Sequence, residues 1–236
     1  MEETKENVEK KENKLGVLKN KKVIITSAIV SVLIIVAIIV AVSLFNKDRI
    51  KFTGESNGIK YSAKMQEDSR VLVVMKNKTG KTISELELNV TYYDAKGNVL
   101  YKSTELIDGY LKNEEITLDR RTTARILDVQ KIERYDIEIN PKYYDGEEKT
   151  SNYEKIEILE QQKRGDKIVV DIKNKTEEEI QDIYFYGVFF KDGLPIEFFA
   201  NYVHNIDKDT KTLEFNEPKD EEGNKIEYDF CEIYMK

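Results

Sequence analysis

The chain has 236 residues, of which 40% are hydrophobic and 35% charged, and its formal net charge is −7. One Cys, one His, three Pro and no Trp, with this much charge, exclude collagen-like, disulfide-rich and polytopic membrane proteins. The mean hydropathy of −0.57 is typical of one or two soluble, acidic domains, but the apolar residues are distributed unevenly along the chain.

Residues 1–22 form a charged segment with seven Lys and five Glu and few apolar side chains. Such a segment cannot bury enough apolar surface to fold by itself. We expect a solvated tail that maintains the membrane topology of the segment that follows it. A cytoplasmic docking peptide is the alternative.

The next segment, residues 23–45, contains no charged residue and only four polar ones, Thr26, Ser27, Ser31 and Ser43. As a helix it would be about 34 Å long, enough to cross a hydrocarbon core of roughly 30 Å. The apolar region of a cleaved signal peptide is shorter, about 7 to 15 residues, and precedes a small-residue cleavage site that is missing here. The segment therefore predicts a transmembrane helix that acts as an uncleaved signal-anchor in the lipid bilayer.

The charges beside this span predict its orientation. Lys14, Lys19, Lys21 and Lys22 precede the span, whereas three basic residues follow it by position 51. The slight excess before the span favours a cytoplasmic N-terminus. Residues 46–236 are then extracytoplasmic, in a single-pass protein of the cell membrane.

The part after the span contains an internal repeat. Residues 70–79 (RVLVVMKNKT) match residues 167–176 (KIVVDIKNKT) at an offset of 97, with Lys-Asn-Lys-Thr identical. At the same offset Ile83 matches Ile180 and Tyr92-Tyr93-Asp94 matches Phe189-Phe190-Lys191. After two single-residue gaps Thr117-Leu118 matches Thr212-Leu213, and each copy closes with Tyr-Asp, at Tyr135-Asp136 and Tyr228-Asp229. We interpret residues 46–144 as a first copy and residues 153–236 as a second copy of one domain, joined by a polar linker at 145–152.

Each copy has the pattern of short β-strands. In the first copy, Leu86, Leu88, Val90 and Tyr92 alternate with polar or exposed-type residues, which is the period of a strand with one buried face. Turn-forming residues separate the apolar runs, as hairpins require. Several such strands in roughly 90 residues predict a mainly β fold with a β-sandwich in each copy.

These residues resemble the FxLYD domain, an immunoglobulin-like β-sandwich of exported bacterial proteins that often follows a single membrane anchor. The likeness rests on a strand that ends in Lys-Asn-x-Thr (76–79 and 173–176), on an Ile-x-x-hydrophobic strand, and on an aromatic pair before an acidic hairpin (92–97). It covers most of residues 59–140 and, more loosely, 154–236, although the family's Leu-x-Pro-Gly-Glu turn is absent from both copies. The resemblance implies two tandem immunoglobulin-like β-sandwich domains with a non-catalytic binding or spacer role.

The residues offer little for catalysis or metal binding. His204 and Cys231 are the single His and Cys; we expect His204 at a turn and Cys231 as a small buried residue on a C-terminal strand, so a Cys-His dyad is disfavoured. The acidic loops at 207–209 and 217–223 lack the alternating order of a calcium loop, and solvated turns are expected there. We expect no enzyme, no cofactor and no metal site.

One strand of the second copy differs from its counterpart. If Ile183 and the alternate residues up to Phe189 face the core, the opposite face is apolar where the first copy is mostly polar. That outward set is Tyr184, Tyr186, Val188 and Phe190. Exposed patches of this kind are usually covered, so either the first copy or a C-terminal segment packs on it, or it docks another protein.

These observations predict a membrane-anchored, extracytoplasmic protein with two β-sandwich domains for protein binding or assembly at the cell surface. Its partners would be the bilayer, through residues 23–45, and an unknown envelope protein; nucleic acid is excluded because residues 46–236 hold 31 basic and 40 acidic residues. An inert spacer or envelope-structure protein is one alternative. A glycan-cleaving enzyme that uses paired carboxylates is the other.

Overall fold

The computed structural model describes residues 49–66, 70–121 and 132–236. The predicted tail, the predicted span at 23–45 and the topology-setting Lys19, Lys21 and Lys22 lie outside these residues. No helix in the described part is long and apolar enough to cross a membrane. Ile50–Lys236 form one compact unit, which is mainly β and whose described strands lie in antiparallel sheets.

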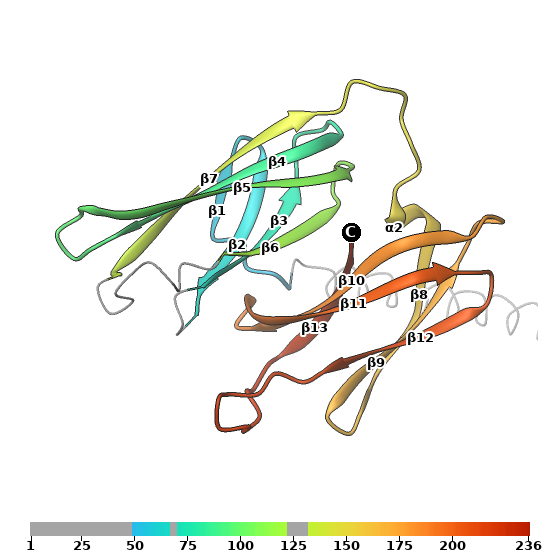
Figure 1. The fold of residues 1–236 in the computed structure, drawn as a ribbon. Coiled ribbons are helices and arrows are strands. Elements are labelled where there is room, and N and C mark those ends of the chain that lie inside the picture. Colours follow the sequence, from blue (N-terminus) through green and yellow to red (C-terminus); the bar gives the residue numbers. More distant parts are fainter. Residues whose placement is uncertain (1–48, 67–69, 122–131) are drawn as a thin grey trace, which may run out of the picture. The chain divides into compact units, whose positions relative to one another are not determined.

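The first copy contains two sheets (Figure 1). One has the order β1-β2-β3-β6, formed by β1 (Gly54–Ser56), β2 (Ile59–Met65), β3 (Val71–Asn77) and β6 (Ile116–Arg121). The other has the order β5-β4-β7, formed by β4 (Ile83–Tyr93), β5 (Val99–Leu111) and β7 (Arg134–Tyr143).

The second copy repeats this arrangement without the short first strand. One sheet has the order β12-β9-β8, formed by β8 (Ile156–Arg164), β9 (Lys167–Asn174) and β12 (Thr210–Asn216). The other has the order β11-β10-β13, formed by β10 (Ile180–Lys191), β11 (Leu194–Ile206) and β13 (Phe230–Met235). Residues 144–151 carry no helix or strand and lead into the one-turn helix α2 (Asn152–Lys155).

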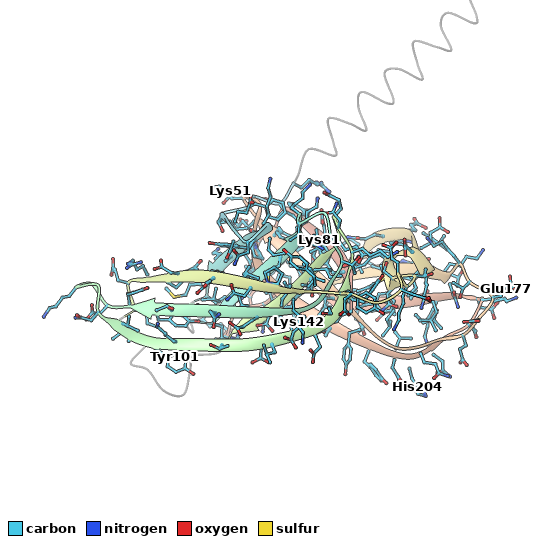
Figure 2. The ribbon with its side chains drawn as sticks, turned by 90° about the horizontal axis from the view of Figure 1, so that it is seen from above. Lys51, Lys81, Tyr101, Lys142, Glu177 and His204 are labelled. Carbon is cyan, nitrogen blue, oxygen red and sulfur yellow. The ribbon has the colours of Figure 1, made fainter. Side chains whose placement is uncertain are left out.

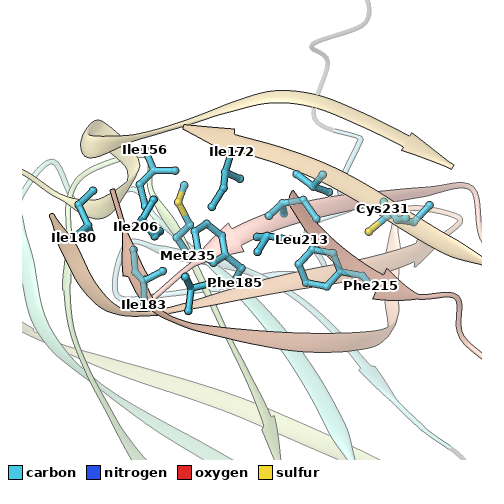
Figure 3. Close-up of a cluster of buried hydrophobic side chains, with 14 of the residues drawn as sticks. Ile156, Ile172, Ile180, Ile183, Phe185, Ile206, Leu213, Phe215, Cys231 and Met235 are labelled. Carbon is cyan, nitrogen blue, oxygen red and sulfur yellow. The ribbon is translucent and has the colours of Figure 1, made fainter. Parts of the chain in front are cut away.

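The two sheets of each copy share one apolar core, an arrangement consistent with a β-sandwich. Alternate residues of β4, from Leu86 to Tyr92, are buried in the first core together with Val71, Val73 and Met75 of β3. The second core is built by the corresponding strands, and Figure 3 shows its side chains meeting between the two sheets. The period-two pattern read from the sequence thus reports the buried face of each central strand.

The identical Lys-Asn-Lys-Thr segments form the same hydrogen-bonded corner in both copies. Asn77 is fully buried; its Nδ2 donates to the carbonyl oxygens of Lys81 (2.8 Å) and Leu111 (3.0 Å), and its Oδ1 accepts from the backbone N–H (3.0 Å) and hydroxyl (2.7 Å) of Thr79. In the second copy the same four bonds join Asn174 to Glu178, Ile206 and Thr176. The motif therefore ties the end of one strand to the start of the next and to the end of the following hairpin, which is a structural role.

Strand register corrects one part of the predicted repeat alignment. The offset of 97 holds for β2 to β4, where Ile59 pairs with Asn77 and Ile156 with Asn174. In β6, however, Leu118 pairs with Val74, whereas Thr212 pairs with Asp171, the counterpart of Val74. The predicted match of Leu118 with Leu213 is one residue out, and a slip of one residue moves a side chain to the other face of a sheet.

The last predicted match is also displaced. Tyr135 pairs with Tyr92, and the residue that pairs with Phe189, the counterpart of Tyr92, is Cys231. Tyr228 lies before β13 and packs edge-on against the ring of Phe189, with the ring centroids 4.8 Å apart. The Tyr-Asp pairs thus resemble each other in sequence but occupy different places in the two copies.

Candidate binding surface

Strand β10 carries apolar side chains on both faces. Ile183, Phe185 and Phe189 point into the second core. On the opposite face, which we call the outer face of β10, Val188 and Phe190 are fully buried, Tyr186 is partly buried and Tyr184 is 45% exposed. The predicted patch is therefore divided between a buried end and an exposed end.

Side chains of the first copy lie against the buried end. Val188, Phe190 and Tyr234 share one apolar cluster with Ile50, Leu72, Val74 and Leu118, which we call the inter-copy cluster. This explains why β3 is apolar at five consecutive positions, since Leu72 and Val74 are buried in this cluster and their neighbours in the first core.

Polar contacts border the inter-copy cluster. Arg120 pairs with Glu197, and its guanidinium lies over the ring of Phe198, 4.3 Å from the centroid. Gln66 Nε2 donates to the carbonyl oxygen of Ile196 at 2.6 Å. The contact is thus both apolar and directional, as a specific interface requires.

The corresponding faces that do not take part in this contact are more polar. By register, Asp171 and Thr212 stand where the first copy has Val74 and Leu118, and the Thr212 hydroxyl donates to Asp171 at 2.6 Å. On β4 the counterpart of Tyr186 is Asn89, whose side chain donates to Glu87 at 2.8 Å. At these positions the face that does not meet the other copy is therefore polar, although Val169, a buried residue, keeps an apolar side chain at the position of Leu72.

The exposed end of the outer face is a pair of tyrosines. Tyr184 on β10 lies directly opposite Tyr202 on β11, with ring centroids 4.9 Å apart and the ring planes tilted by 43°. Tyr202 is 52% exposed. The row continues to Tyr186 (6.3 Å from Tyr184) and Phe198 (5.7 Å from Tyr186), and so joins this tyrosine pair to the inter-copy cluster.

Polar side chains fix the rim of the tyrosine pair. Asp182 Oδ1 accepts a hydrogen bond from the Tyr202 hydroxyl and lies 2.8 Å from His204 Nδ1. The bond from Tyr202 and the contact with His204 lower the pKa of Asp182, and the same bond from Tyr202 raises the pKa of that phenol. The carboxylate is thus held in its ionised form at the protein surface.

His204 is not at a turn, contrary to the prediction. It lies within β11, because the β10–β11 hairpin stays paired as far as Ile180 and Ile206. Figure 2 shows His204 among the surface side chains of the second copy. Its position next to Asp182 follows from strand pairing, which the local sequence does not reveal.

Tyr202 and Asp182 were not predicted as parts of this surface. A hairpin that turns at Asp192-Gly193 with regular pairing would set Asn201 opposite Tyr184. A register shift between Phe189 and Phe190 brings Tyr202 there instead. The alternation of Tyr202 and His204 in the sequence was the available signal. Whether these two residues lie on the same face of the sheet as Tyr184 depends on the register shift.

Cys231 lies in the second core on β13, as expected for a small buried residue. Burial raises the pKa of its thiol to about 12, which keeps the thiol protonated and unreactive. His204 is exposed on β11. The structure therefore does not join these two residues into a dyad.

The acidic loops engage protein groups. Glu217 is buried and accepts from Lys163 Nζ (2.5 Å), Lys225 Nζ (3.1 Å) and the Tyr228 hydroxyl. Burial opposes its ionisation, but the bonds from Lys163, Tyr228 and Lys225 prevail and lower the pKa of Glu217 to about 2. Asp220 accepts backbone N–H groups of its own turn, and no group of three His, Cys, Asp or Glu is placed to hold a metal ion among the described residues.

A cavity of about 330 Å³ lies beside the first core, where residues 149–153 pass β4 and β5. Its lining includes Leu86, Ile107, Leu111, Thr117, Ser151 and Met235. Two polar side chains of the lining are already engaged, because Ser151 bonds to Glu115 and the Tyr153 hydroxyl donates to the carbonyl oxygen of Ile116 at 2.7 Å. These two side chains therefore serve contacts within the protein.

In comparisons with known proteins, no family model matches the chain and none of the curated proteins matches it.

Proposed function

We propose that the chain is a single-pass, membrane-anchored, extracytoplasmic protein whose two copies are immunoglobulin-like β-sandwich domains of the FxLYD type. In this proposal the domains are non-catalytic and serve protein binding or assembly at the cell surface. The anchor is the apolar segment at 23–45, and Lys19, Lys21 and Lys22 keep the N-terminus in the cytoplasm.

One observation carries the binding role. Tyr184 and Tyr202 remain about half exposed at the end of an aromatic row whose other end is buried. Large aromatic side chains are enriched in binding surfaces because one end is apolar and the other can be hydrated. The pair is therefore a surface by which a larger assembly could be joined.

Protease treatment of intact cells tests the location. We expect added protease to remove the described domains from a chain that carries a cytoplasmic N-terminal tag, and the tag to stay protected. Protection of residues 46–236 until the cells are opened would refute the proposed topology.

In-cell crosslinking of the tagged full chain tests the binding role. We expect crosslinked products that are lost in the Tyr184→Ser and Tyr202→Ser variants. The inert-spacer alternative, which the extensive inter-copy cluster favours, predicts the same crosslinked products for all three chains.

A further inference from the structure

We propose that the tyrosine pair is a glycan-binding platform, on which Tyr184 and Tyr202 stack against the sugar rings of an uncharged polysaccharide and Asp182 accepts hydrogen bonds from sugar hydroxyl groups. The proposal rests on the proposed function as a surface protein, and it names the chemistry of the ligand.

The exposed area of the pair fits a small, flat ligand. Tyr184 is 45% and Tyr202 is 52% exposed, so together they offer roughly 200 Å², because a tyrosine presents about 150 to 250 Å² in all. A specific protein interface takes about 800 Å² from each partner. The rest of the aromatic row is covered by the first copy, so the free part matches the size of one or two sugar rings, and a protein partner would have to contact surface beyond the pair.

The shape of the pair suits a sugar. The ring of a sugar has a face of C–H groups, which packs on an aromatic face, and an edge of hydroxyl groups, which needs polar partners. The two tyrosine rings, 4.9 Å apart and tilted by 43°, form an angled aromatic floor on a sheet surface. The residues at its rim, Asp182 and His204, are both exposed and polar.

Asp182 has acceptor capacity left for such a ligand. The Tyr202 hydroxyl and His204 Nδ1 both contact Oδ1. Oδ2 has no hydrogen-bond partner among the described residues. An ionised carboxylate at the rim accepts hydroxyl donors and repels anionic sugars, which favours an uncharged polysaccharide.

The first copy supplies the contrast. By register, Glu87 and Leu106 occupy the positions of Tyr184 and Tyr202, so the corresponding surface of the first copy has no aromatic floor. The pair is also dispensable for the inter-copy cluster, because neither tyrosine belongs to it. The two exposed rings are thus a feature of the second copy alone.

Co-sedimentation with insoluble polysaccharides tests the proposal. The full chain, held in detergent micelles, is mixed with chitin and with cellulose as uncharged probes, and with crosslinked polygalacturonate as an anionic probe. We expect binding to at least one uncharged probe and none to the anionic one. No binding to either uncharged probe, or equal binding to the anionic probe, would overturn the proposal.

Matched variants locate the binding. Tyr184→Ala and Tyr202→Ala should each weaken binding about tenfold, whereas Tyr184→Phe, which keeps the ring, should stay within about threefold. Tyr143→Ala removes a tyrosine that is 43% exposed on β7 of the first copy and should bind like the unaltered chain. Melting temperatures equal to that of the unaltered chain confirm that the variants are folded. If Tyr184→Ala and Tyr202→Ala both bind as tightly as the unaltered chain, the tyrosine pair is not the binding site.

The two proposals fail separately. Binding to chitin or cellulose in micelles does not depend on where the chain resides, whereas protease treatment of cells reports only the location. A chain that binds but is protected in intact cells keeps the glycan platform and loses the surface location. A chain that is cleaved on intact cells but does not bind loses the glycan platform alone.

Discussion

Phe215 of β12 packs directly over the backbone of Gly187 in β10, so that a Cβ at Gly187 would lie 2.7 Å from the phenyl ring. The counterpart of Gly187 in the first copy is Val90, which is fully buried. In the second core the ring of Phe215 therefore occupies the space beside Gly187 of the central strand β10. In the first core the Val90 side chain of the central strand β4 fills part of the corresponding space.

Gly187→Ala should therefore destabilise the second copy. We expect a loss of about 1 to 3 kcal/mol, because an added methyl group forces a closely packed ring to move. Urea unfolding of the full chain in micelles measures it. In the Gly187→Ala background, Phe215→Leu should cost clearly less than it does alone; equal costs would show that the two positions are independent.

The duplicated asparagine corner predicts two equal losses. Asn77→Ala and Asn174→Ala each remove a buried side chain that makes four hydrogen bonds, and each should cost about 2 to 3 kcal/mol because the former partners are left unpaired. Thermal unfolding measures the effect. Asn216→Ala, at an exposed position of β12, is the control. If this control loses as much stability as Asn174→Ala, the buried hydrogen bonds of the corner do not explain the loss.

Two opposite substitutions at corresponding positions of the two copies should differ in their effect on stability, because only one of the positions lies in the inter-copy cluster. Val74→Asp places a charge among buried apolar side chains and should cost about 3 kcal/mol or more. Asp171→Val makes the reverse change at the corresponding position of the second copy, outside the cluster, and should shift stability by less than about 1 kcal/mol. Urea unfolding compares the two, and similar effects would contradict the assigned interface.

Glu217 predicts a dependence of stability on pH. Its pKa is about 2 in the folded chain and 4.5 without the fold, so the folded state favours the ionised form. Its contribution is complete above about pH 4.5 and is lost as pH falls towards 2. Glu217→Gln should flatten the stability curve in this window, with the exposed Glu221→Gln as control. An unaltered slope would show that Lys163 and Lys225 do not stabilise the carboxylate.

The central strands of both copies could be predicted from the sequence because their buried faces alternate strictly. Leu86 to Tyr92 and the residues from Ile183 to Phe189 carry this pattern, and the structure buries them in the two cores. The identical Lys-Asn-Lys-Thr segments revealed the repeat, although their buried role depends on carbonyl groups far along the chain.

The pairing of the outer strands could not be predicted in the same way. The register shift in the β10–β11 hairpin decides that Tyr202, and not Asn201, faces Tyr184, and no local pattern marks it. The match of Leu118 with Leu213 failed for a related reason, since two similar residues face opposite sides of equivalent strands. The similarity between the copies therefore predicts where the strands lie, but not which face of every strand is buried.

The polar surfaces at Asp171 and Thr212, and at Glu87 and Asn89, also concern the association of further units through the same contact. A contact between two different faces of a repeated unit can in principle continue without end and build a fibre. Here Asp171 and Thr212 stand in place of Val74 and Leu118, and Glu87 and Asn89 in place of Tyr184 and Tyr186, so the free faces are more polar than the inter-copy cluster. In the reverse order of the two units, Asp171 and Thr212 would face Glu87 and Asn89, so polar side chains would meet where the observed order joins apolar ones.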